Sequence, residues 1–434
     1  MLKLLRQNFV NHSFSVNLFH INVRSTTSNK SSMDNSGVER QWIKNPSYQN
    51  YKPKADETEI TVMSYNLLAQ DLIDKHTYLY STHNGPDLTY HVRSQRLINE
   101  MKRIRPDILC LQEMQESHVM DFKLKCFSID LQELIFKKRT QDDLTDGCAI
   151  FFNSDLLELV SEEKVEYFQP NVHVLNRPNV AIVAKFRLRT SPYSELVVAT
   201  THLLYNPRRQ DVRLAQVQVL LAEIDRIAYQ GIDEHCRARY SPVILTGDFN
   251  FQPNTAPYSL IVNGYLTYSS LSKRLQIPRP YEPKFGDILL PIELGITDDC
   301  QHFDRNVPML HSHENHTSER AIAPVEKLYE SQLPFQTGML KHRLNFGSVY
   351  DDAVSASTYQ DQWVLVDYIF YRRESTMTNH SVEKNIKLVA RFELPSREQC
   401  YYHLPYGGIP NASQGSDHFA LAAKFLVSFS DDTR

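Results

Sequence analysis

Apolar residues recur along this chain in two patterns, one typical of buried strands and the other of helices. Short runs rich in β-branched and aromatic residues, bounded by polar segments, predict strands. Such runs lie at residues 59–68, 107–112, 148–152, 180–188, 195–200, 242–246, 363–371, 386–394 and 419–427. Helical spacing predicts a long helix over 207–229 and an earlier one, ended by Arg105-Pro106, that carries Val92, Leu97, Ile98, Met101 and Ile104.

Strands and helices interleave, with many direct strand-to-strand connections. This order predicts a four-layer α/β sandwich, in which two packed mixed β-sheets are flanked by helices. We expect this domain to occupy residues 58–430, after a polar linker over 34–57. Between 266 and 345 the periodicity is lost and Pro, His and polar residues accumulate, which predicts a long surface insertion.

The first residues of the chain differ in composition from the rest. Residues 1–33 contain no Asp or Glu and combine four basic residues with several serines, which indicates a mitochondrial targeting segment. The alternative is an unstructured tail on a cytoplasmic or nuclear protein. No run of eighteen apolar residues occurs, so we expect no membrane span. The six cysteines form no Cys-x-x-Cys pair, which argues against zinc and favours an intracellular compartment.

Short polar motifs stand at the ends of several predicted strands. They are Ser64-Tyr65-Asn66, Leu111-Gln112-Glu113, Thr201-His202-Leu203, Gly247-Asp248-Phe249-Asn250, Val366-Asp367-Tyr368 and Ser416-Asp417-His418. Because each adjoins apolar residues, we expect them to meet at one rim of the sandwich. Taken singly, each is more often a solvated strand end or a turn, so the prediction depends on their combination.

These residue types suit hydrolysis of a phosphoester. Mg²⁺ prefers oxygen ligands, which Asn66, Glu113 and Asp417 offer, with Asp248 as a further carboxylate, and Mn²⁺ is the alternative ion. In-line attack at phosphorus also needs a deprotonated nucleophile and stabilisation of negative charge on oxygen. The net charge of −4 does not by itself indicate a nucleic-acid binder, but an acidic site with bound Mg²⁺ can hold phosphate locally.

The remaining motif residues suit proton transfer and phosphate binding. His418, oriented by a carboxylate such as that of Asp367, can act as a base or as a cation. His202 and Asn250 can donate hydrogen bonds to phosphoryl oxygens.

The ordered set of motifs resembles the endonuclease/exonuclease/phosphatase superfamily from about Ile60 to Val427. The stretches 63–68, 110–113, 145–150 and 245–250 look like its carbon-catabolite-repressor-type deadenylase branch. The run from Thr201 to Asp211 is most similar to one subfamily, the angel proteins. The resemblance implies metal binding by Asn66 and Glu113, and a second-metal or water-positioning role for Asp417. It implies catalytic roles for His202, Asp248, Asn250, Asp367 and His418.

The same resemblance implies action on RNA 3′ ends, either removal of a 2′,3′-cyclic phosphate or 3′→5′ exoribonuclease and deadenylase activity. Deadenylases of this branch tend to carry Trp-Asp-Pro where this chain has Tyr205-Asn206-Pro207, and a Phe near the position of Trp363 stacks on adenine. A lost stacking platform costs about 1–3 kcal/mol per base, which would erode poly(A) preference and favours the cyclic phosphatase. We expect substrate contacts from Tyr205, Asn206, Pro207, Arg209 and Trp363.

Other classes remain as alternatives. A non-catalytic RNA-binding adaptor could keep this fold, and an abasic-site endonuclease could share the chemistry. A histidine group at His311, His313 and His316 suggests a metal site, but its place in the aperiodic insertion favours a solvated loop. We expect a monomer that binds RNA 3′ ends and no membrane, and the sequence indicates no particular protein partner.

Overall fold

The computed structural model describes residues 38–234, 236, 238–272, 274–304, 335–375, 381–382, 385–404 and 408–428. The predicted targeting segment 1–33 and the histidine group at 311–316 lie outside these residues. Residues 36–434 form one unit by their contacts, and the architecture belongs to that unit. Among the described residues, no helix has both the length and the apolar character that a bilayer crossing requires.

The first of two large sheets has seven strands in the order β1-β20-β21-β2-β3-β5-β4. Their bounds are β1 Trp42–Lys44, β2 Glu57–Asn66, β3 Ile108–Gln115, β4 Glu133–Lys138, β5 Asp146–Phe152, β20 Ile386–Phe392 and β21 Leu421–Ser428. β2 and β3 run parallel to each other, so their carboxyl ends lie at the same rim. Asn66 and Glu113 come from these two ends.

The second sheet has six strands in the order β14-β17-β11-β8-β7-β6. Their bounds are β6 Leu157–Glu166, β7 Val180–Leu188, β8 Ser191–His202, β11 Val243–Asp248, β14 Phe346–Ser348 and β17 Asp367–Arg372. This sheet also contains a parallel pair, β8 and β11, which ends at His202 and Asp248. The predicted late strand over 363–371 is in fact divided into β16 (Trp363–Val364) and β17.

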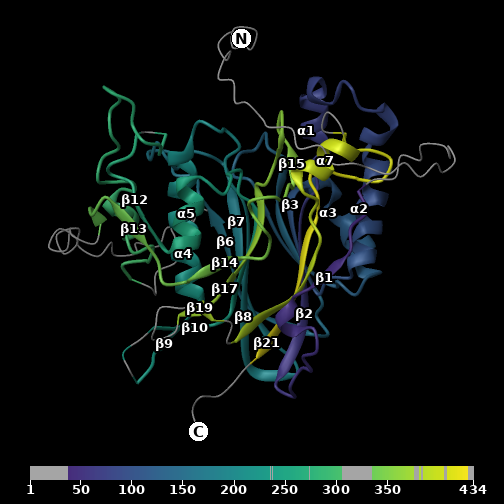
Figure 1. The fold of residues 1–434 in the computed structure, drawn as a ribbon, viewed down its shortest axis with the longest axis horizontal. Helices are drawn as coiled ribbons and strands as arrows, with labels where there is room; N and C mark the ends of the chain where they lie inside the picture. The colour runs from purple at the N-terminus through teal and green to yellow at the C-terminus, as the bar shows by residue number, and fades with distance from the viewer. Residues whose placement is uncertain are drawn as a thin grey trace, which may run out of the picture. The chain divides into compact units, whose positions relative to one another are not determined.

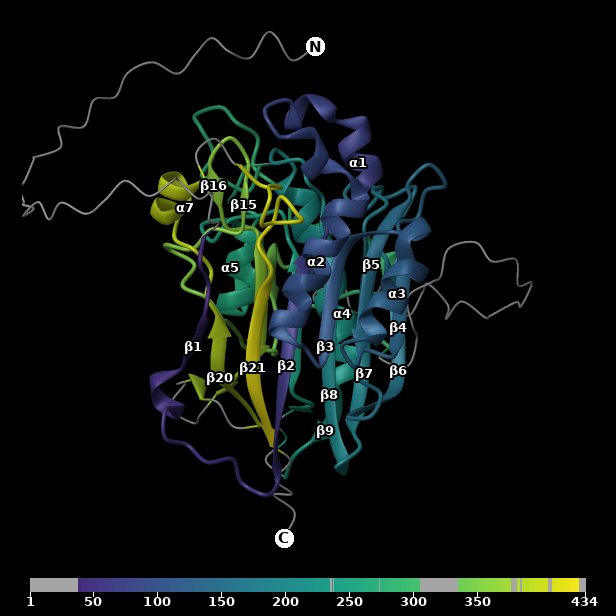
Figure 2. The ribbon, with the colours of Figure 1, turned by 90° about the vertical axis from the view of Figure 1, so that its right-hand side faces the viewer.

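The helices cover the outer faces of the two sheets, which confirms the predicted four-layer α/β sandwich. Figures 1 and 2 show α2 and α3 on the outer side of the first sheet, and Figure 1 shows α4 and α5 beyond the second. The helices are α1 Gln70–Lys75, α2 Tyr90–Ile104, α3 Val119–Phe127, α4 Gln210–Ala228, α5 Ala256–Asn263 and α7 Arg397–His403. The short 3₁₀ helices are η1 Pro46–Tyr48, η2 Thr77–Tyr80, η3 Gly85–Leu88, η4 Glu116–His118 and η5 Ile292–Leu294.

Four two-stranded sheets complete the described elements. They pair β9 Tyr229–Ile232 with β10 Ala238–Tyr240, β12 Tyr265–Thr267 with β13 Met339–Lys341, β15 Thr358–Tyr359 with β16, and β18 Glu374–Ser375 with β19 Ser381–Val382.

The local sequence of helix α2 determines which of its faces is buried and where the helix ends. Leu97 and Met101 lie on its buried face against the first sheet. The helix ends at Arg105, which adopts a left-handed conformation with φ of 52°. Pro106 disfavours a right-handed helical conformation at the residue before it, so the helix cannot continue. The buried face begins at Arg93, whereas Val92, which the spacing had placed on it, is only half-buried.

Two predicted boundaries need correction. Within the expected linker over 34–57, Trp42–Lys44 pairs with β20, so this part belongs to the first sheet. The expected surface insertion over 266–345 begins and ends in the paired strands β12 and β13. Its described residues include core members such as Leu290 and Ile296. The insertion covers the outer side of α4, because the Gln218 side chain donates to the Thr297 carbonyl at 3.0 Å.

Candidate active site

The rim of the sandwich brings together six titratable side chains from both sheets. These residues, called the rim cluster, are Glu113, His202, Asp248, Asp367, Asp417 and His418. Asp248 ends β11 and lies between its neighbours on the second sheet, opposite Asp367 on β17 and His202 on β8. The sequence prediction that the strand-end motifs meet at one rim is confirmed in this geometry.

Glu113 reaches the rim through a local irregularity in β3. The register between β3 and β5 shifts between Leu111 and Met114, and Glu113 has a positive φ of 53°. A bulge of this kind bends the strand and redirects a side chain. Asn250, just after β11, has the same φ of 53°. Non-glycine residues at positive φ are uncommon and concentrate at functional sites.

Asn66 joins the carboxylates from the two sheets. Its amide nitrogen donates to Glu113 Oε1 at 2.9 Å and to Asp248 Oδ2 at 3.0 Å, while its oxygen accepts from the Leu68 backbone N–H at 3.0 Å. A backbone N–H needs an acceptor, which fixes the orientation of the amide. Asn66 therefore lies here as a hydrogen-bond donor that orients two carboxylates, whereas the sequence had predicted an oxygen ligand.

His418 and Asp367 form the predicted couple. His418 Nδ1 lies 2.8 Å from Asp367 Oδ2, and its Nε2 lies 3.9 Å from Asp248 Oδ2 and 4.0 Å from Asp417 Oδ1. Burial alone would lower the pKa of His418, but the charge and hydrogen bond of Asp367 raise it well above its usual value. His418 is therefore a buried cation aimed at the centre of the rim cluster.

His202 differs from His418 in charge. Its Nε2 lies 3.6 Å from Asp248 Oδ2. Burial, assisted by the positive charge of Arg139, lowers the pKa of His202 to about 4. At neutral pH the ring is uncharged, so it can accept or donate a single hydrogen bond at Nε2.

The carboxylates of the rim cluster crowd one another. Burial and the charge of Asp367 raise the pKa of Asp248 to about 8. Burial and the charge of Asp417 likewise raise the pKa of Glu113. One ligand atom each from Glu113, His202 and Asp248 lies within 4.8 Å of the others, which is a spacing that could hold a metal ion.

Asp417 is held from one side. Its Oδ2 accepts from the Tyr80 hydroxyl at 2.9 Å, whereas its buried Oδ1 has no hydrogen bond among the described residues. An excess of buried carboxylate oxygen, with one atom unpartnered, fits a divalent cation, because a hard cation prefers oxygen donors and would offset the repulsion.

Asn250 supports the loop that follows β11. Its backbone N–H donates to Asp248 Oδ1 at 3.0 Å, and its side-chain amide donates to the Leu203 carbonyl at 3.0 Å. One amide hydrogen remains for a phosphoryl oxygen. The same bond ties the loop after β11 to the loop after β8, which carries His202.

The loop Tyr205-Asn206-Pro207 leads from β8 into α4 at the edge of the rim. The buried guanidinium of Arg213 holds it, donating to the carbonyls of residues 204 and 206 at 2.7 and 2.9 Å. Tyr205 is 64% exposed and is free to contact a substrate. Arg209 is less available than predicted, since it forms a two-point ion pair with Asp211 at 2.9 and 3.0 Å.

Trp363 cannot make the predicted substrate contact. It is 2% exposed and stacks on Phe419 in the core, with ring centroids 5.8 Å apart. A face that is covered by protein cannot bind a base. The apolar residues around Trp363, which made it part of a predicted strand, are the reason that it is buried.

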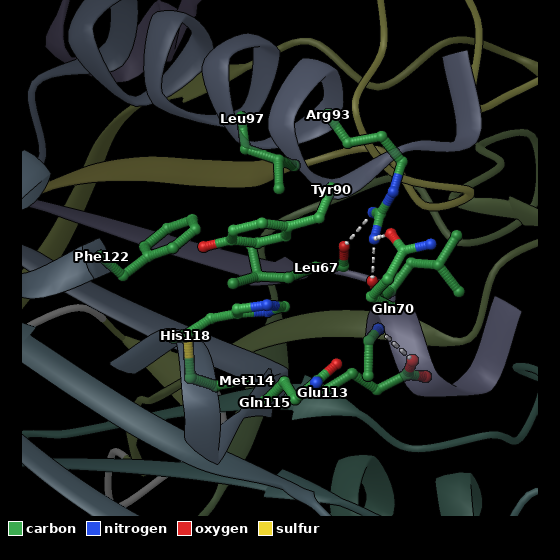
Figure 3. Close-up of a pocket in the computed structure, with 12 residues that line it drawn as sticks. Leu67, Gln70, Tyr90, Arg93, Leu97, Glu113, Met114, Gln115, His118 and Phe122 are labelled. Carbon is green, nitrogen blue, oxygen red and sulfur yellow. Dashed lines mark hydrogen bonds between the residues drawn. The ribbon is translucent and has the colours of Figure 1, made fainter. Parts of the chain in front are cut away.

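Arg93 is a residue of the site that sequence reasoning missed. Figure 3 shows it pointing from α2 toward Leu67 and Gln70, in a pocket that Glu113 also lines. Its guanidinium donates to the carbonyls of Leu67, Leu68 and Gly415 at 2.9, 2.7 and 2.9 Å. Arg93 therefore fastens the loop after Asn66 to the loop before Asp417. An arginine on the apolar face of a helix was the available signal.

Ser416 makes a second link between the same two loops. Its hydroxyl donates to the Asn66 carbonyl at 2.6 Å and accepts from the His418 backbone N–H at 3.2 Å. Gly415 beside it is needed for close approach, since a Cβ there would lie 2.7 Å from the Arg93 carbonyl oxygen. The loops beside the rim cluster are thus held by buried hydrogen bonds from the Arg93 and Ser416 side chains to backbone carbonyls.

The comparisons with known proteins agree with this geometry. A model described as the Endonuclease/Exonuclease/phosphatase family matches residues 63–418, which span every residue of the rim cluster. Protein angel homolog 2 of Homo sapiens is 32% identical over 405 residues, which cover 87% of this chain and 72% of the human protein. Protein angel of Drosophila melanogaster is 32% identical over 370 residues, or 84% of this chain and 80% of the fly protein.

A solved structure matches over the same extent. It is the crystal structure of ANGEL2, a 2′,3′-cyclic phosphatase, in complex with adenosine-2′,3′-vanadate. The TM-score is 0.71 and the sequence identity 29%, with 91% of this chain and 100% of that chain covered.

Proposed function

The chain belongs to the Endonuclease/Exonuclease/phosphatase family, and we propose that this hydrolase removes the 2′,3′-cyclic phosphate from RNA 3′ ends. The observation that carries the proposal is the complete rim cluster, in a chain that matches a 2′,3′-cyclic phosphatase over 91% of its length. The His418–Asp367 contact of 2.8 Å and the central Asp248 give that cluster a cation and a carboxylate base.

The chemistry of the substrate supports RNA. A 2′,3′-cyclic phosphate needs both ribose hydroxyls, so it cannot form on deoxyribose. In a polymer it can stand only at a 3′ end. A rim site on rigid strand ends suits a chain terminus, which enters without distortion of a duplex.

The donor set fits a divalent cation. Glu113 and Asp248, which lie at a metal-binding spacing, would hold it together with the unpartnered oxygen of Asp417, and Mg²⁺ is the ion that such oxygen donors favour, with Mn²⁺ as the alternative. When bound, the ion would neutralise charge on the phosphoryl oxygens.

The protein's own side chains would carry the protons. Burial and the charge of Asp367 raise the pKa of Asp248, and a bound cation would offset both; the ionised Asp248 can then accept the proton of the attacking water. Two successive hydrolyses convert the cyclic end to a diol: the first opens the ring to a phosphomonoester and the second releases inorganic phosphate. Each breaks one bond from phosphorus to a ribose oxygen, and in each the His418 cation can give its Nε2 proton to that leaving oxygen. Asp367 keeps His418 oriented and charged. Neutral His202 and Asn250 can hydrogen-bond the phosphoryl oxygens.

A direct assay tests this proposal. The full chain is incubated with one 5′-labelled RNA ending in a 2′,3′-cyclic phosphate or a 3′-hydroxyl, with Mg²⁺ or with chelator. We expect conversion of the cyclic end to a diol without shortening, only with the metal, and loss of that conversion in Asp248→Asn and Glu113→Ala. Asp130→Asn is the matched control, because Asp130 is an exposed partner of Arg105 far from the rim.

Other outcomes assign other functions. A ladder of shortened products from the 3′-hydroxyl RNA would show a 3′→5′ exoribonuclease instead. No product from either RNA, with RNA still retained in a gel shift, would show a non-catalytic RNA-binding protein.

A further inference from the structure

The end of the β4–β5 hairpin carries buried polar atoms without partners. Within the described part of the chain, Arg139 Nε, Thr140 Oγ1 and Asp146 Oδ2 are buried and make no hydrogen bond. Such atoms are rare in folded proteins, because each costs about 1–3 kcal/mol of lost hydration. Three of them at one hairpin end point to a polar ligand or bound solvent at this place.

This hairpin end lies beside the rim cluster. The Thr140 backbone N–H donates to the Pro178 carbonyl at 3.4 Å, and the next residue, Asn179, donates from its side chain to the His202 carbonyl at 3.0 Å. Asp146 pairs with Gln115 on β3, two residues beyond Glu113. The positive charge of Arg139 also contributes to the lowered pKa of His202.

The Arg139 guanidinium is only loosely engaged. Its one protein contact is Nη1 to Asp146 Oδ1 at 3.5 Å, which leaves the Nε edge of the fork unused among the described residues. The Arg139 side chain is 20% exposed, so solvent reaches part of its guanidinium although Nε itself is buried; the Asp146 side chain is 3% exposed. Neighbouring Lys137, by contrast, is tied to Glu166.

The position of Arg139 along the rim separates it from the reacting centre. Asp367, Asp248 and His202 form a row on adjacent strands β17, β11 and β8, and Val180 of β7 follows His202. Arg139 lies next to the segment just before Val180. Neighbouring strands are about 4.8 Å apart, so β7 lies roughly 10 Å from β11, which is further than one phosphate spans.

We propose that Arg139 and Thr140 form a second phosphate site, which binds the phosphodiester between the terminal nucleotide and the one before it. This inference deepens the proposed function, on which it rests, by naming the substrate as an RNA chain rather than a cyclic mononucleotide. A guanidinium fork matches two oxygens of a phosphodiester, and the Thr140 hydroxyl can donate to one of them. The 3.5 Å contact with Asp146 leaves the guanidinium able to turn toward such a phosphodiester.

The test compares substrates of two lengths in the full chain. Wild type and Arg139→Gln are assayed on adenosine 2′,3′-cyclic phosphate and on an oligonucleotide with the same cyclic end. We expect the ratio of kcat/KM for the oligonucleotide to that for the mononucleotide to fall about tenfold in the variant, through KM. Arg139→Lys should restore part of the ratio. Arg187→Gln is the matched control, since Arg187 also faces a carboxylate at 3.5 Å but at the opposite end of β7.

Several outcomes would overturn the inference. Equal losses on both substrates would place Arg139 at the reacting phosphate or make it a support of His202. An unchanged ratio, or the same fall in Arg187→Gln, would remove Arg139 from RNA binding.

A binding arm keeps the test informative if no variant hydrolyses either substrate, a result that would count against the proposed function alone. Fluorescence anisotropy with an RNA ending in a 3′-phosphate then decides. Arg139→Gln should weaken binding and lower the slope of log affinity against log salt by roughly one contact. Equal affinity and slope in both proteins would end the proposal of a second phosphate site.

Discussion

Two buried clusters of charged side chains in this molecule contain similar residues but differ in how positive and negative charges are balanced. One is the rim cluster. The other, called the helix cluster, consists of Glu163, Glu223, Arg226 and His302 on the outer side of the second sheet. Each contains a histidine bonded to a buried carboxylate, at 2.8 Å for His418 and Asp367 and at 2.7 Å for His302 and Glu223.

The difference lies in how charge is balanced. Arg226 lies 2.8 Å from both Glu163 and Glu223. Burial alone would raise the pKa of Glu223, but His302 and Arg226 hold it below its usual value. In the rim cluster burial and like charge instead raise the pKa of Asp248 to about 8. A cluster that matches its charges stabilises the fold, whereas one that leaves a carboxylate excess is ready for a cation and substrate.

The largest expected effect comes from the centre of the rim cluster. Asp248→Asn should lower kcat/KM for the cyclic RNA end by about 10²–10⁴-fold, because it removes the proton acceptor. Metal-free stability should stay the same or rise, since one of several repelling carboxylates is gone. The measurements are hydrolysis kinetics and urea unfolding in chelator. A clear loss of stability would contradict this, because it would show that the Asp248 carboxylate stabilises the fold, as we expect of Glu223 in the helix cluster.

The helix cluster should respond in the opposite way. Glu223→Gln removes the carboxylate that binds His302 and leaves Arg226 with Glu163 alone in a buried place, so the free energy of unfolding should fall by about 2–3 kcal/mol. The kcat/KM of the folded fraction should stay within about twofold, since the cluster does not contact the rim. Denaturant unfolding measures the change in stability, and kinetics normalised to the folded fraction measure kcat/KM. A tenfold loss of kcat/KM would contradict the assignment of the helix cluster to stability alone.

A third test concerns what holds the rim cluster in place. Arg93→Lys keeps the charge but loses the fork that binds three carbonyls, so the Mg²⁺ concentration for half-maximal activity should rise about tenfold or more. Arg96→Lys on the same helix is the control, because Arg96 binds Asp87 away from the two loops. A lowered stability with an unchanged Mg²⁺ dependence would limit Arg93 to a structural role.

The sequence predicted the rim cluster but not the helix cluster, and the reason is physical. The rim residues each follow or precede an apolar strand, so local periodicity and one family resemblance were enough to bring Asp248 and His418 together. The bond between Glu223 and His302 joins positions 79 apart, and one partner lies in a segment without periodicity. No local pattern therefore predicted this pair, although both side chains are buried.

The same limit explains the individual errors at the site. Trp363 was predicted from its local sequence to contact the substrate, and Arg93 was missed, because helix or strand spacing does not report which layer covers a side chain. A tryptophan in an apolar run is covered by Phe419, and an arginine on an apolar face is satisfied by three loop carbonyls. Neither outcome follows without the tertiary contacts.

The smallest expected effect is the pH dependence of the stability that Glu223 contributes in the helix cluster. The pKa of Glu223 is lowered in the folded state from 4.5, so its contribution to stability is complete above about pH 4.5 and is lost as pH falls through the folded pKa. The difference in unfolding free energy between wild type and Glu223→Gln should therefore be constant from pH 7 to 5 and shrink below about 4.5. Urea unfolding in chelator at pH 7, 5 and 4 measures this difference. A gap that widened on acidification would mean that Glu223 is held as a neutral acid, and that the charge matching with Arg226 does not stabilise the fold.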